Sequence, residues 1–103
     1  MSRTQRDIAY RLELTRKALG LSAAELCKNV GMGTNQWSQY VDPERGRRIT
    51  VDVVYRLKDE YGITFEWIYD ADRSRLPSDL LEKIRATERL GPVDLSRTRG
   101  RKK

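Results

Sequence analysis

Closely spaced helix start and stop signals constrain this chain more than any other feature of its sequence. Ser and Thr favour helix N-termini, and four of them precede segments whose apolar residues recur at helical spacing: Thr4, Ser22, Thr50 and Thr64. Glycine, which favours helix C-termini, follows three of those segments: Gly20, Gly31 and Gly62. No segment alternates apolar and polar residues over more than a few positions, so the sequence predicts an all-α fold of short helices.

The signals define six expected helical segments. They cover residues 4–19, 22–30, 34–41, 50–61, 65–69 and 77–90. Ser22 and Glu25 have the spacing of a capping box at the start of the second segment. Pro43 and Gly46 break helices, so residues 42–46 are expected to form a loop. We expect the first five helices to form one cluster and the sixth, after the polar residues 70–75, to stand apart from it.

Composition excludes several classes of function. The 103 residues include no His and one cysteine, so the chain cannot build a Cys/His zinc site, a Cys–His pair or a Ser-His-Asp triad. We therefore expect no enzyme activity, no metal site and no cofactor. One cysteine argues against a disulfide scaffold, and no signal peptide or membrane-length apolar run is apparent, so we expect a cytoplasmic, nucleoid-associated protein. The formal net charge of +6 indicates polyanionic partners only weakly.

The residues between Ser22 and Tyr40 carry the main functional signal. A capped helix of about two turns, a glycine, a tight turn and a second short helix have the spacing of a helix-turn-helix. Cys27 supplies the small side chain that two steeply crossing helices need, and Gly31 can adopt a left-handed backbone at the bend. Trp37 and Tyr40 are expected to face inward and anchor the second helix.

The opposite side of the helix expected at 34–41 is polar and uncharged. It consists of Thr34, Asn35, Gln36, Ser38 and Gln39, with Gln36 at the edge. In a chain with 35% charged residues, a solvated face would ordinarily carry Lys and Glu. Asn and Gln can make bidentate contacts with adenine, and Thr and Ser can reach several base edges. The face therefore indicates base reading in DNA, and the alternative is a polar helix that only faces water.

An ordered set of short motifs supports this interpretation. They are RL at 11–12, RKALGLS at 16–22, EL at 25–26, VG at 30–31, SQY at 38–40, GRRIT at 46–50 and YGITFEWI at 61–68. Together they resemble the phage repressor and Cro type helix-turn-helix family, often called XRE-like, over roughly residues 6–72. The resemblance implies a five-helix domain that binds a palindromic operator as a dimer, with the helix at 34–41 in the major groove.

The resemblance also implies roles for individual residues. Thr34 and Asn35 would be the leading base readers, and Gln39 would follow one turn later. Contacts to DNA phosphates would come from Arg16, Gly33, Arg45, Arg47 and Arg48. For Arg45, Arg47 and Arg48, the alternative is that they lie in a loop that faces water and contacts no DNA.

Two departures from the family pattern affect these roles. Ala23 stands where many relatives have a glutamine, which removes one polar contact. The segment before Gly46 is about two residues longer than usual, which affects how the loop that carries Arg45, Arg47 and Arg48 (the arginine loop) would dock on DNA. Glu44, within that segment, is the carboxylate expected to brace Arg16.

The C-terminal third is expected to contain a linker and helix at 73–91 and a basic, disordered tail at 92–103. The apolar residues Leu80, Leu81, Ile84 and Leu90 could cap the core of the 1–72 domain or meet the same helix of a second copy, and we favour dimerisation. The tail contains Arg97, Arg99, Arg101, Lys102 and Lys103, which suit either a non-specific DNA arm or a plain unfolded end.

The sequence therefore predicts a homodimeric, sequence-specific DNA-binding protein that acts as a small prokaryotic or phage transcriptional regulator, with repression as the expected mode. One alternative is an antitoxin-type DNA-binding protein whose C-terminal region clasps a protein partner. Another is a protein-interaction module that kept the fold and lost DNA binding. The second alternative is favoured by Ala23 and by the lengthened loop.

Overall fold

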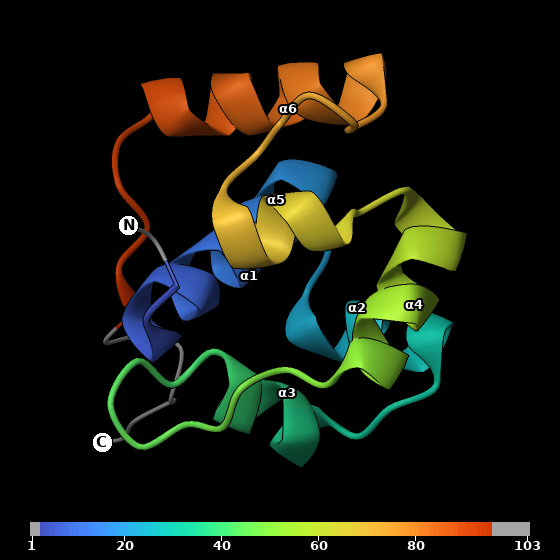
Figure 1. Ribbon diagram of the computed structural model, residues 1–103, viewed down its shortest axis with the longest axis vertical. Coiled ribbons are helices and arrows are strands. Elements are labelled where there is room, and N and C mark those ends of the chain that lie inside the picture. The colour runs from blue at the N-terminus through green and yellow to red at the C-terminus, as the bar shows by residue number, and fades with distance from the viewer. Residues whose placement is uncertain (1–2, 96–103) are drawn as a thin grey trace.

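The computed structural model describes residues 3–95, which form six helices and, within that range, no strand (Figure 1). The helices are α1 (Gln5–Leu19), α2 (Ala23–Val30), α3 (Thr34–Tyr40), α4 (Val51–Tyr61), α5 (Phe65–Asp70) and α6 (Ser78–Arg89). The prediction of an all-α fold is confirmed. Each helix boundary lies within a residue or two of the one expected from the start and stop signals.

Side-chain caps explain why these helices begin where they do. The hydroxyls of Thr4, Ser22, Thr50 and Thr64 each accept a hydrogen bond from the backbone N–H three residues later. At Ser22 the capping box is complete, because the Glu25 carboxylate also accepts from the Ser22 backbone N–H at 2.9 Å. Those hydrogen bonds lower the pKa of Glu25. The predicted caps are therefore confirmed at all four positions.

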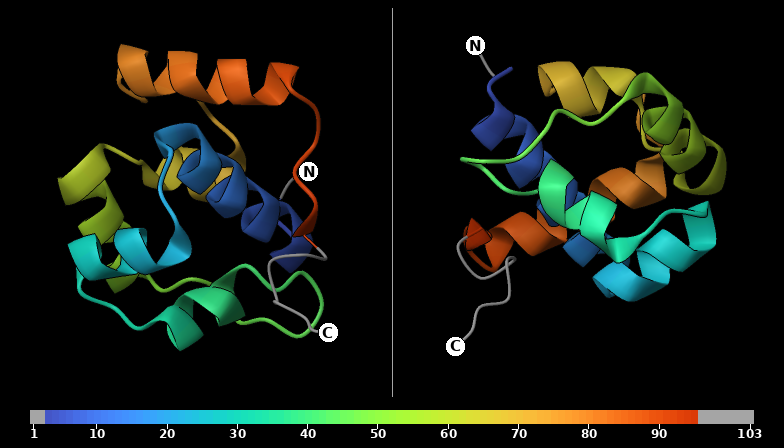
Figure 2. Two further views of the ribbon diagram at one scale, coloured as in Figure 1. Left: turned by 180° about the vertical axis from the view of Figure 1, so that it is seen from behind. Right: turned by 90° about the horizontal axis from the view of Figure 1, so that it is seen from below.

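Helix α1 lies in the centre of the fold, between α6 and the α2–α3 pair (Figures 1 and 2). It packs against α5 and α6, and it is buried around most of its circumference rather than along one stripe. Three of its buried side chains are polar: Arg11, Glu13 and Thr15. Each has an internal partner. For example, the Thr15 hydroxyl accepts a hydrogen bond from the Trp67 indole at 2.8 Å.

Helix α6 packs on α1 and belongs to the same core as the other helices. Leu80 and Ile84 are 4% and 0% exposed, so these two residues cap the core of their own chain. Arg73, before the helix, donates two hydrogen bonds of 2.8 and 2.6 Å to Glu88 near its end. The helix therefore does not stand apart. Of the four residues expected to cap the core or to meet a second copy, Leu80 and Ile84 are buried within their own chain, Leu81 is half-buried and Leu90 is 89% exposed.

Residues 91–95 follow α6 and return along α1. The backbone N–H of Val93 donates a hydrogen bond of 3.3 Å to the Tyr10 hydroxyl, and Leu95 is buried. Val93 and Leu95 of the expected tail thus contact the domain, and the five predicted tail cations lie outside the described residues. In the described part of the chain, no helix is long and apolar enough to cross a membrane.

Candidate nucleic-acid interface

The turn between α2 and α3 has the geometry that the sequence predicted. Gly31 ends α2 with a φ of +71°, a left-handed conformation that strains residues with a Cβ. The next backbone N–H, from Met32, donates back to the Cys27 carbonyl at 2.9 Å. The Cys27 side chain is 1% exposed, and burial raises the pKa of its thiol. Cys27 is therefore buried and Gly31 is left-handed, as predicted, and α2 packs against α3.

Trp37 and Tyr40 turn the inner side of α3 toward the core. They are 2% and 1% exposed, as predicted. The Trp37 indole N–H donates a hydrogen bond of 3.0 Å to Oε2 of Glu13, which comes from α1. This bond, together with the packing of both aromatic rings, fixes which side of α3 faces outward.

The outer side of α3 carries the predicted base-reading residues. Thr34, Asn35, Ser38 and Gln39 are exposed. Gln36 is half-buried, and its side-chain amide donates a hydrogen bond of 2.8 Å to the Tyr40 hydroxyl. The structure thus places four of the five predicted residues together on one exposed face. Gln36 lies at the margin of that face, with its side-chain amide already hydrogen-bonded to Tyr40.

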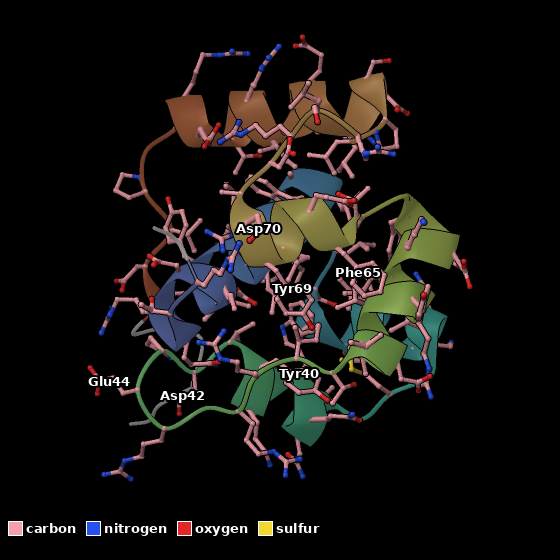
Figure 3. The ribbon with its side chains drawn as sticks, in the orientation of Figure 1. Tyr40, Asp42, Glu44, Phe65, Tyr69 and Asp70 are labelled. Carbon is pink, nitrogen blue, oxygen red and sulfur yellow. The ribbon has the colours of Figure 1, made fainter. Side chains whose placement is uncertain are left out.

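The loop after α3 is held firmly to the end of that helix. The Gln5 side-chain amide donates to the backbone carbonyls of Tyr40 and Asp42 at 3.1 and 3.2 Å. The Asp42 carboxylate in turn accepts from the backbone N–H groups of Glu44 and Arg45, both at 3.0 Å. Figure 3 shows Asp42 and Glu44 on this loop, with Tyr40 beside it. The loop is therefore an ordered continuation of α3.

Three arginines project from this ordered loop. Arg45, Arg47 and Arg48 are all exposed. The Arg47 backbone N–H donates to the Gln39 carbonyl at 3.0 Å, which places this residue next to the C-terminal end of the α3 face. Burial raises the pKa of the Tyr69 hydroxyl, and the nearby positive charge of Arg48 opposes that shift. Three exposed arginines thus lie on the segment that directly follows the uncharged face of α3.

The prediction that Glu44 pairs with Arg16 is wrong. Arg16 donates two hydrogen bonds, at 3.1 and 2.7 Å, to the carboxylate of Glu13 and a third to the backbone carbonyl of Leu21. Glu44 instead pairs with Arg6 at 3.2 Å on the surface. Glu13 lies one turn before Arg16 on the same helix, so the two side chains are neighbours without any help from the loop. With 16% of its side chain exposed, Arg16 offers little surface to a phosphate.

Glu13 is the residue of this region that the sequence analysis missed. It is 1% exposed and receives hydrogen bonds from both Trp37 and Arg16. A buried carboxylate is costly unless such donors compensate it. The signal in the sequence is an acidic residue between the apolar Leu12 and Leu14, three positions before an arginine.

The remaining position expected at the phosphates is Gly33. It is exposed immediately before α3 and has an extended backbone with a φ of −81°. Over residues 3–95, no group of three or more His, Cys, Asp or Glu side chains could hold a metal ion. Comparisons with family models, with curated proteins and with solved structures give no match to this chain.

Proposed function

We propose that this chain is a sequence-specific, double-stranded DNA-binding protein of the phage repressor and Cro type, and that it regulates transcription by occupying an operator. The observation that carries the proposal is the orientation of α3. Trp37 and Tyr40 are buried, so the uncharged amide and hydroxyl side chains face outward beside three exposed arginines. In this interpretation, α2, the turn and α3 are the helix-turn-helix.

The size and chemistry of the α3 face suit the major groove. Seven residues form a helix about 10 Å long, and the groove is about 12 Å wide. We assign base reading to Thr34, Asn35 and Gln39, with Ser38 beside them. An amide such as that of Asn35 can donate to and accept from adenine at once, whereas a lysine or glutamate presents a single kind of partner.

The positive charge beside α3 suits the DNA backbone. Arg45, Arg47 and Arg48 are assigned to phosphates, and the backbone N–H of Gly33 to a phosphate at the start of α3. Each neutralised phosphate releases counterions and contributes about −0.9 to the slope of log affinity against log salt. Because the Arg47 N–H is bonded to the Gln39 carbonyl and Gln5 bridges the Tyr40 and Asp42 carbonyls, the backbone that carries these arginines is tied to α3.

Two copies on a palindromic site would double the number of bases read. One α3 face can reach only a few base pairs, which gives limited specificity. The exposed apolar residues Val51 and Tyr55 on α4, at 54% and 53% exposure, are available for a contact between copies. The buried Leu80 and Ile84 of α6 are not.

The proposal is tested by selecting bound fragments from random DNA and then measuring affinity for the selected duplex against salt. We expect one recurring, two-fold symmetric motif and an affinity that falls steeply between about 50 and 200 mM salt. Failure to enrich any motif would contradict sequence-specific binding. Binding to a co-purifying protein with little salt dependence would instead favour the antitoxin-type or protein-interaction alternatives.

A further inference from the structure

A pocket of about 600 Å³ lies where α6 packs on α1. Of the described residues, those that line it belong to the ends of α1 and α6 and to the segments that follow these two helices. It therefore uses neither the outer face of α3 nor the arginine loop. Small-molecule sites in proteins commonly have volumes of about 300–1,000 Å³, so the pocket is large enough to hold a small ligand.

Two cations line the α1 side of the pocket. Lys17 is exposed and forms no ion pair within residues 3–95. Arg16 uses three of its five N–H groups on Glu13 and Leu21, which leaves two without a partner in the part of the chain that the structure describes.

The same two cations favour a small anion over DNA. The side chain of Arg16 is only 16% exposed, so a phosphate that is held on a duplex cannot approach it closely. A small molecule that enters the pocket can. A carboxylate matches the combination of an ammonium group and paired guanidinium N–H groups, because each of its oxygens accepts charge-assisted hydrogen bonds.

The other side of the pocket is largely apolar. Leu90, Pro92 and Val93 line it, and Leu90 is 89% exposed to water. An apolar ligand that covers such a side chain releases the water around it, which favours binding. Asp94 also lines the pocket, and its negative charge disfavours a ligand with more than one negative charge.

We propose that this pocket binds a small carboxylic acid with an apolar body. Lys17 and the two remaining N–H groups of Arg16 bind the carboxylate, and Leu21, Leu90 and Val93 contact the body. Binding at this site does not require DNA, so the inference goes beyond the proposed function. It also gives Arg16, which the sequence placed at a DNA phosphate, a different ligand.

The probe is octanoate, and its binding to the full chain is measured by isothermal titration calorimetry without DNA. Octan-1-ol is the control without a charge, and inorganic phosphate is the control without an apolar body. We expect saturable binding of octanoate that is about fivefold or more tighter than binding of either control. Phosphate that binds as tightly as octanoate would overturn the inference, as would octanoate that does not saturate.

Two exposed side chains separate the charged and apolar contacts of the ligand. Lys17→Gln should weaken octanoate binding by up to about fivefold and leave octan-1-ol binding unchanged. Leu90→Ser should weaken the binding of both probes by about tenfold. Because both side chains are exposed, the circular dichroism spectrum and the unfolding midpoint should not change in either variant.

Lys58→Gln is the matched control for the loss of charge. Lys58 is exposed on α4, outside the pocket, so octanoate binding should not change in this variant. Equal weakening by Lys17→Gln and Lys58→Gln would overturn the inference, because the anion would then respond only to the net charge of the chain. Octanoate binding that is unaffected by both Lys17→Gln and Leu90→Ser would also overturn it, because the ligand would then lie elsewhere.

Discussion

The indole N–H of Trp37 donates a 3.0 Å hydrogen bond to the buried carboxylate of Glu13, and this bond joins α3 to the central helix α1. The same carboxylate holds the guanidinium of Arg16, which also donates to the Leu21 carbonyl between α1 and α2. One side chain with 1% exposure therefore links α1 to α3 directly and, through Arg16, to the segment that leads into α2. The direction in which the polar face of α3 points depends on a group that never reaches the surface.

Replacing Glu13 with Gln should destabilise the fold. The isosteric amide removes the charge that partners Arg16 and places an NH₂ group where Trp37 or Arg16 needs an acceptor. We expect a loss of about 1.5–3 kcal/mol in the free energy of unfolding, measured by urea denaturation. Glu44→Gln is the matched control, since its pair with Arg6 is exposed and should contribute less than about 1 kcal/mol. Equal losses in the two variants would show that burial of Glu13 carries no energetic consequence.

Replacing Asn35 with Ala should alter which DNA is bound without altering the fold. The side chain is exposed, so the unfolding midpoint should not move, whereas affinity for the selected duplex should fall by about 1–3 kcal/mol. The variant should accept more than one base pair at a single position of the selected motif, which is measured by repeating the selection from random DNA. Arg47→Ala should weaken all duplexes alike. An unchanged motif from the Asn35 variant would show that base reading lies elsewhere.

The parts of this fold that depend on neighbouring residues could be predicted from the sequence. The cap at Ser22 and the left-handed residue at Gly31 are decided within one helical turn, and both are confirmed. The partner of Arg16 also lies within one helical turn, at Glu13, but the prediction followed the family resemblance and chose Glu44 of the loop instead. The pattern of α6 identifies its apolar side at Leu80 and Ile84. It does not say whether another helix of the same chain or a second copy covers that side.

Replacing Gly46 with Ala should disrupt the arginine loop. A Cβ at this position would fall on the backbone carbonyl oxygens of Gln39 and Asp42 and would lie 2.8 Å from the Gln5 amide nitrogen. Backbone oxygens cannot move aside cheaply, so we expect a loss of about 1–3 kcal/mol in urea denaturation, with weaker DNA binding. The control is Gly33→Ala, where a Cβ meets nothing within 4 Å and the cost should stay near or below about 1 kcal/mol. A smaller loss at Gly46 than at Gly33 would contradict this account.

The thiol of Cys27 should react with thiol reagents only when the protein unfolds. Its side chain is 1% exposed, and burial raises the pKa of the thiol, so little nucleophilic thiolate is present in the folded chain. Labelling in increasing urea should follow the unfolding curve measured by circular dichroism. Rapid labelling without urea would mean that the α2–α3 crossing opens in the folded state.

The ion pair between Arg73 and Glu88 should make a pH-dependent contribution to stability. Hydrogen bonds from Arg73 lower the pKa of Glu88, and Arg73 is itself held 5.0 Å from the centre of the Trp67 ring. A carboxylate with a lowered pKa stabilises the fold above its unfolded value, about 4.3, and loses that contribution as the pH falls through the folded value. The side chains are 34% and 36% exposed, so solvent screening limits the contribution to less than about 1 kcal/mol. The Tm of the unaltered chain should therefore exceed that of Glu88→Gln at about pH 7, and the difference should vanish well below pH 4. A difference in Tm that stays constant across this range would assign the effect of Glu88 to packing rather than to its charge.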